Sequence, residues 1–245
     1  MLFGVIISLI IVVVAAVCLF WDRSDSKKEL LVVKRTYHLN TTSINEIEVP
    51  IFISKQDEKI VDEHTYGFIH NKNETKKILV STITQKENHD ETFKNSKYYG
   101  YFIMIKLPDI IGDLKIEDLY LTVFDGLGNQ TLYLGSLYTT NEVSTLTSMT
   151  ITELSGIKDE YMHLKQIIMK VTDYHRITKI MIADTEVPFY IADDRLIMNI
   201  QVQSCYYNNP YVKIYCGDNF YMLNNFDYFF HYQLLIDEYF TIYQM

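Results

Sequence analysis

The clearest local signal in the chain is Leu119-Tyr-Leu-Thr-Val-Phe-Asp-Gly-Leu-Gly-Asn-Gln-Thr-Leu-Tyr-Leu134. Two apolar runs, at 119–124 and 130–134, flank the turn sequence Asp125-Gly-Leu-Gly-Asn129. Gly126 and Gly128 can take a positive φ without steric cost, so the stretch predicts a β-hairpin. The turn lacks the further carboxylates that a Ca²⁺ loop needs, and we expect no metal ion there.

Strand patterns continue on both sides of this hairpin. Tyr98–Leu107 is an aromatic and β-branched run that Pro108 ends, and Leu196–Gln203 alternates apolar and polar residues. Glu46–Ile53 alternates too, but Pro50 cannot donate to a central ladder, which predicts an edge strand or a strand with a break. The chain is therefore expected to be mainly β and sandwich-like.

One or two helices are expected among the strands. A Thr/Ser-rich segment at 139–150 indicates where the β-rich globular region 30–245 could divide into two sub-domains. After it, apolar residues at helical spacing predict a helix with Ser155 as its N-cap: Ile157, Tyr161, Leu164, Ile168 and Val171. A strand is the alternative for Ile167–Val171, and the C-terminal tail after Asn225 fits either a final helix or two strands.

The N-terminal segment predicts a membrane anchor. Residues 2–21 contain no charged side chain, and a helix of twenty residues spans about 30 Å, the thickness of a bilayer core. We therefore expect 1–21 to be an uncleaved transmembrane signal-anchor that contacts lipid, followed by a juxtamembrane linker at 22–29. Two alternatives are disfavoured. A cleaved signal peptide would begin with basic residues, which are absent here, and a lipoprotein acylated at Cys18 would need a small residue where Val17 stands.

Two signals oppose each other on the orientation of this anchor. Arg23, Lys27 and Lys28 follow the helix and, by the positive-inside rule, favour a cytoplasmic body. Cys205 and Cys216 flank an Asn-Asn-Pro turn, and strands paired across it would bring the thiols within disulfide reach, which favours an exported body. Two buried, reduced cysteines are the alternative. We expect a single-pass cell-membrane protein with an extracytoplasmic domain, and a cytoplasmic domain is the alternative.

The C-terminal tail is dense in aromatic residues from 226 to 243. An exposed apolar surface of that size is typical of a binding site, whereas a buried tail would belong to the core. The residues expected to form a partner surface are Phe226, Tyr228, Phe229, Tyr232, Tyr239 and Phe240.

Charge and motifs exclude several classes of function. The formal net charge is −9 and the Lys-Lys pairs are isolated, so nucleic acid is not an expected partner. No nucleophile-elbow, Walker or dinucleotide-binding motif occurs, and the histidines show no zinc-binding spacing. Asp62-Glu63-His64 and Asp193-Asp194 place titratable groups side by side on turn-like segments, where such groups are usually solvated. We expect no enzyme activity, catalytic residue, cofactor or metal.

These features predict a non-enzymatic, membrane-anchored domain that works through protein–protein interaction. It would serve as an accessory or assembly subunit of a cell-envelope or membrane complex, such as a transporter, with a membrane protein as its partner. One alternative is an extracytoplasmic module that binds a ligand such as a carbohydrate by stacking aromatic side chains on sugar rings. The other is a hydrolase whose site is assembled from scattered carboxylates and histidines.

Overall fold

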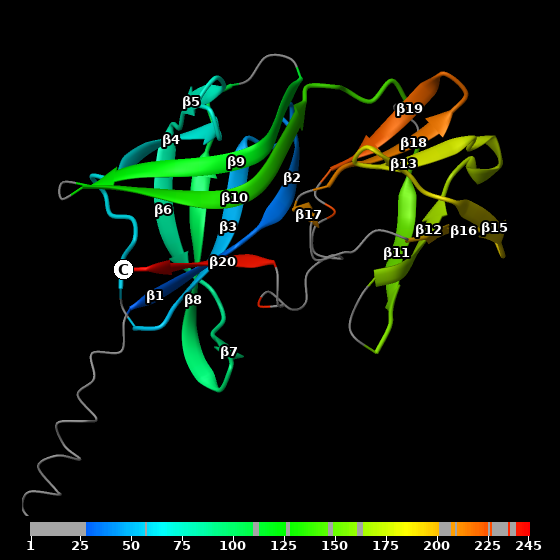
Figure 1. The fold of residues 1–245 in the computed structure, drawn as a ribbon. Helices are drawn as coiled ribbons and strands as arrows, with labels where there is room; N and C mark the ends of the chain where they lie inside the picture. The colour runs from blue at the N-terminus through cyan, green and yellow to red at the C-terminus, as the bar shows by residue number, and fades with distance from the viewer. Residues whose placement is uncertain are drawn as a thin grey trace, which may run out of the picture.

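The computed structural model describes residues 28–56, 58–109, 113–125, 128–146, 149–160, 164–200, 207–208, 210–224, 226, 235 and 239–245. Within these ranges the chain is mostly β and forms two sandwiches that lie side by side (Figure 1). The mainly β, sandwich-like fold expected from the sequence is confirmed. Alternating apolar residues bury one face of each sheet, which is why a chain with this pattern closes sheets in pairs.

The first sandwich consists of sheets A and B. In spatial order, sheet A contains β20 (Phe240–Gln244), β1 (Glu29–Val33), β3 (Glu46–Ile53), β8 (Ser96–Lys106) and β6 (Thr82–Glu87), with β7 (Glu91–Phe93) paired to β8. Sheet B contains β17 (Tyr207–Asn208), β2 (Arg35–Asn40), β10 (Gly128–Thr140), β9 (Leu114–Asp125), β4 (Tyr66–Asn71) and β5 (Lys77–Leu79). Side chains from both sheets form one core, in which Ile51, Ile105 and Leu121 are fully buried.

The hairpin expected from the sequence is confirmed as β9 and β10. Asp125 pairs with Gly128 at its tip, but Gly128 begins a strand and takes no positive φ. Gly126 lies outside the described residues. Instead Gly135, at a bulge in β10, has a φ of 114°, and a Cβ there would clash with the carbonyl oxygen of Arg35 in β2. A glycine is therefore required where β2 joins the hairpin.

Pro50 lies in a central strand, so the expectation of an edge strand was wrong. β3 is paired with β8 on one side and with β1 on the other. Ser54 donates its N–H to the carbonyl of Glu29 in β1, and the alternating orientation of a strand points the nitrogen of Pro50 to the same side. Pairing with β1 ends at Ile51, so the missing N–H of Pro50 costs no ladder hydrogen bond.

The second sandwich consists of two smaller sheets. One contains β11 (Ile151–Lys158), β12 (Leu164–Val171), β16 (Arg195–Asn199) and β15 (Phe189–Ala192). The other contains β14 (Thr185–Glu186), β13 (Lys179–Ile182), β18 (Val212–Cys216) and β19 (Asn219–Leu223). A separate core joins them, with Ile167, Ile180 and Ile214 fully buried. Independent folding of the two parts, with a division near 139–150, stays a prediction.

The helix expected between 157 and 171 was wrong, since β11 and β12 occupy this region. Ser155 pairs with Ile168 across the ladder, and Ile167, Met169 and Val171 are buried in alternation, as the strand alternative requires. β12 pairs with β11 and β16 and buries β-branched side chains on one face of the sheet. This packing outweighs the helical preference that the apolar spacing of one short run suggests. Tyr161 lies outside the described residues.

Helical structure in the described part of the chain amounts to one 3₁₀ turn, Tyr174–Arg176. No helix in these same residues has the length and apolar character needed to cross a bilayer. The expected anchor at 1–21 and most of its linker lie outside the described residues, so the anchor stays a prediction.

Candidate functional site

Strand β6 forms an open edge of sheet A. Among the described strands it pairs with β8 alone. Asn88, which follows β6, donates its N–H to the carbonyl of Gly100 at 2.9 Å, and hydrogen-bonded pairs alternate along an antiparallel ladder. Counting back from Asn88, the even-numbered residues of β6 bond to β8. The backbone N–H and C=O groups that point away from the sheet therefore belong to Ile83, Gln85 and Glu87.

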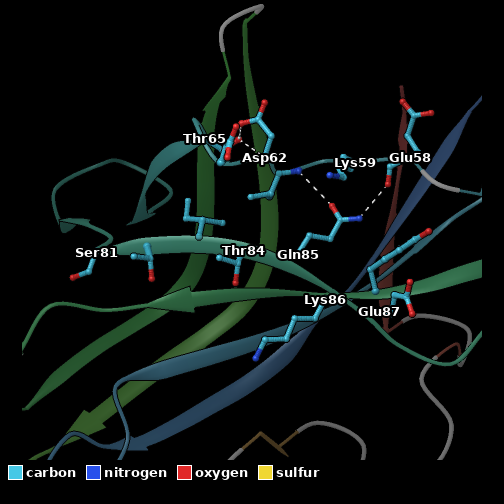
Figure 2. Close-up of a pocket in the computed structure, with 14 residues that line it drawn as sticks. Glu58, Lys59, Asp62, Thr65, Ser81, Thr84, Gln85, Lys86 and Glu87 are labelled. Carbon is cyan, nitrogen blue, oxygen red and sulfur yellow. Dashed lines mark hydrogen bonds between the residues drawn. The ribbon is translucent and has the colours of Figure 1, made fainter.

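A groove of about 730 Å³ runs beside this open edge. Figure 2 shows β6 along one side of it and the segment 58–65 along the other. The side chain of Gln85 joins the two sides: its amide oxygen accepts the N–H of Ile60 at 2.9 Å, and its amide nitrogen donates to the carbonyl of Glu58 at 3.1 Å (Figure 2). Because Ile60 is buried in the first core, the segment is held firmly against the sandwich.

Carboxylates outnumber ammonium groups around the groove. The charged lining residues are Glu58, Asp62, Glu63 and Glu87 against Lys59 and Lys86. Hydrogen bonds from the Thr65 hydroxyl and the His64 N–H hold the pKa of the Asp62 carboxyl below its usual range, so it stays ionised at neutral pH. Glu58 is paired with Lys28 at 3.1 Å. The remaining negative charge favours a cationic ligand.

An aromatic ladder, defined by its residues below, covers the outer face of sheet B. Its members alternate with core residues along three neighbouring strands: Tyr66, Phe68 and His70 in β4, Tyr120 and Phe124 in β9, and Tyr133 in β10. The ring centroids of Tyr66 and Phe124 are 5.1 Å apart in a stacked arrangement, and those of His70 and Tyr120 are 5.6 Å apart. Tyr66 is 61% exposed and directly follows Thr65 of the groove. The two surfaces therefore adjoin each other.

The aromatic ladder is held in place by further contacts. The ammonium group of Lys77 lies 3.5 Å from the centroid of Phe68, a cation–π contact. The Nε2 atom of His70 lies 2.9 Å from the hydroxyl of Thr122, which lies 2.8 Å from that of Thr131. Rings that stack on one another present mainly their edges to solvent, a surface better matched to an apolar protein partner than to the flat face of a sugar.

His38 lies where the two sandwiches meet. Its ring stacks on Tyr138 of β10 at 5.0 Å and lies edge-on to Tyr211, just before β18, at 6.2 Å. Burial lowers the pKa of His38 to about 4, and the carboxylate of Asp184 only partly offsets this. The imidazole is therefore neutral at neutral pH, and its ring contacts both sandwiches.

The aromatic residues expected to form a partner surface lie in different places. Phe226 is 1% exposed and belongs to the second core. The ring of Phe240, at the start of β20, lies 4.9 Å from that of Phe93, and the carbonyl of Tyr239 accepts the N–H of Lys34. The other three lie outside the described residues: Tyr228, Phe229 and Tyr232. A tail surface that includes them stays a prediction.

The strand pairing expected around the cysteines was wrong. β17 does not pair with β18 across the Asn-Asn-Pro turn but lies beside β2 in the other sandwich. Cys216 ends β18 and is partly buried, whereas Cys205 lies outside the described residues, so the disulfide stays a prediction. No group of three or more His, Cys, Asp or Glu side chains that could hold a metal ion gathers in the described part of the chain. The hydrolase hypothesis also stays untested.

Neither the groove nor the aromatic ladder was expected from the sequence. The signal for the ladder is present, because Tyr66, Phe68 and His70 alternate, as do Tyr120 and Phe124. Recognising it requires the register between β4 and β9, which are far apart along the chain. The groove leaves no local signal, since it depends on which strand stands at the edge of the sheet.

Comparison with known proteins yields no family. No protein-family model and no curated protein matches the chain. Among solved structures, the tandem immunoglobulin domains A164–A165 of titin are matched over 80% of this chain and 95% of theirs, with 6% identity and a TM-score of 0.22. At that score the similarity supports no inference about fold or function.

Proposed function

We propose that this protein is a non-enzymatic binding domain, anchored in the cell membrane by residues 2–21, that serves as an accessory or assembly subunit of a membrane complex such as a transporter. The observation that carries the proposal is the open edge of β6 beside the groove. Unpaired backbone groups on an edge strand are a template for another chain, and proteins without such a partner usually cover them. This edge is therefore suited to recruiting a protein.

Co-purification tests this function. The tagged full-length chain, extracted from its native membrane in mild detergent, is expected to bring down an integral membrane protein. Gln85→Ala removes the hydrogen bonds that join the segment 58–61 to β6 and is expected to lower the recovered partner several-fold. Gln166→Ala is the matched control, because it removes a glutamine that bonds to Asn199 in the second sandwich at 3.0 Å. Recovery of the free monomer alone would contradict the proposal.

The proposed orientation places the globular region outside the cytoplasm, with the cytoplasmic side as the alternative. A membrane-impermeant thiol reagent applied to intact cells tests it through Cys205 and Cys216. Labelling that appears only after reduction would support both an external domain and a disulfide. Labelling only after lysis would place the domain in the cytoplasm.

Carbohydrate binding on the aromatic ladder is a second candidate function, favoured by Tyr66, which is 61% exposed. A ring exposed to that degree can stack on a sugar even where its neighbours show only edges. In a pull-down on insoluble polysaccharides, Tyr66→Ala is expected to reduce retention of the full chain in detergent. Tyr190→Ala, at a 46% exposed tyrosine of the second sandwich, is the control. Equal retention of both variants would remove this candidate.

A further inference from the structure

The backbone groups on the open edge of β6 match those of an extended peptide. Ile83, Gln85 and Glu87 each point an N–H and a C=O outward, as the register with β8 requires. Residues two apart in a strand are separated by about 6.6 Å, which is also the repeat of a neighbouring strand. A partner segment of about five residues could therefore satisfy all three positions at once.

The charge of the groove selects among extended partners. Its lining contains two more carboxylates than ammonium groups, one of which, Glu58, is paired with Lys28, and the whole chain has a formal net charge of −9. A second copy of this chain, pairing through its own β6, would bring two acidic grooves together, and like charges at an interface weaken association. A segment that carries Lys or Arg would gain from the same charges.

The side chains of an added strand would alternate between two environments. The Gln85 side chain points toward the segment 58–65, whereas that of Lys86 points to the opposite side of β6 (Figure 2). An added strand has the same alternation, so every second side chain would lie on the side of Asp62 and Glu63. Basic residues are therefore expected at every second position of the partner segment.

From these observations we propose that the groove beside β6 accepts an extended, Lys- or Arg-containing segment of a protein partner as an additional strand of sheet A. The inference rests on the proposed function and specifies the chemistry of its partner. Main-chain hydrogen bonds would supply affinity, and the acidic groove would supply selectivity.

Two synthetic peptides test the proposal on the full-length chain in detergent micelles. One alternates Lys with Val over nine residues, and the other replaces each Lys by Glu, both with blocked termini. The basic peptide is expected to bind at least tenfold more tightly, and more weakly as salt is raised. Amide hydrogen exchange should slow at Ile83, Gln85 and Glu87. The amides of Thr82, Thr84 and Lys86 should change little, because they already bond to β8.

Two variants at one position separate the backbone contribution from the charge. Glu87→Pro removes an outward N–H as well as a carboxylate, and proline is tolerated on an edge strand where that N–H faces solvent. Glu87→Gln removes the charge alone. We expect binding of the basic peptide to fall about twofold to fivefold in Glu87→Gln and more than tenfold in Glu87→Pro. Similar losses in both variants would overturn strand addition.

Equal binding of the two peptides, protection away from β6, or dimerisation of the chain through β6 would each contradict the inference. If neither peptide binds but the chain still co-purifies with a membrane protein, this inference fails and the proposed function stands. If the basic peptide binds as described and no membrane protein co-purifies, strand addition stands and the proposed subunit role fails.

Discussion

The two sandwiches differ in how much structure extends beyond the core. Strands in the first reach 13 residues, whereas the longest described strands of the second contain eight. Both bury a continuous apolar core, but the first also carries the groove and the aromatic ladder. The aromatic ladder lies on the hairpin strands β9 and β10 together with β4, and the groove lies beside the edge strand β6. The candidate binding surfaces therefore belong to the first sandwich, which contacts the second at His38.

Replacing a glycine by alanine in each sandwich is expected to give the largest difference in the free energy of unfolding. Gly135→Ala would force a Cβ against the backbone of Arg35 at a φ of 114°, and should destabilise the first sandwich by at least about 4 kcal/mol. Gly217→Ala, at a φ of 63° in open space, should cost only about 1–2 kcal/mol. Urea unfolding followed by intrinsic fluorescence measures both. Equal losses would mean that the close approach of β2 to β10 is not needed for stability.

A smaller effect is expected from truncating a core aromatic residue of the second sandwich. Phe226 is 1% exposed in that core, and Phe226→Ala should cost about 3 kcal/mol by leaving a cavity. Amide exchange should accelerate in β13 and β18 and stay nearly unchanged in β3 and β8. Tyr190→Ala, at an exposed position of the same sandwich, should change stability by less than about 0.5 kcal/mol. Uniform acceleration across both sandwiches would show that they unfold as one unit.

The smallest expected effect concerns the joint between the sandwiches. Burial holds the pKa of His38 at about 4 in the folded chain, below the ordinary value of 6.5, so the unfolded chain binds more protons between these values. The contribution of the neutral His38 side chain to the free energy of unfolding is complete above about pH 6.5 and is lost as the pH falls toward 4. At pH 5 the loss is about 2 kcal/mol.

His38→Gln should remove this part of the pH dependence in urea unfolding measured from pH 5 to pH 7.5. His175→Gln, at an exposed histidine in the 3₁₀ turn, is the control variant. An unchanged slope in His38→Gln would show that the joint does not depend on a neutral imidazole.

Local patterns predicted the strands better than the way they assemble. The hairpin of β9 and β10 was recognised because its turn and both strands are adjacent in sequence. The region 157–171 was misread as a helix because apolar spacing in one short run fits both structures. Pro50 was expected at a sheet edge because it has no N–H to donate. That N–H is not needed in the central strand, because the pairing of β3 with β1 ends at Ile51, and the sequence around Pro50 does not show where β1 stops pairing.

The mainly β, sandwich-like character could be predicted from the sequence, because alternating apolar residues and turn signals act over a few neighbouring residues. The sequence also predicts the apolar anchor at 2–21, outside the described residues. Three features appear only in the assembled fold: β6 stands at an open edge, the segment 58–65 turns this edge into a groove, and β4 and β9 align their aromatic rings. These features depend on the order and register of strands distant in sequence, which follow from packing the whole chain.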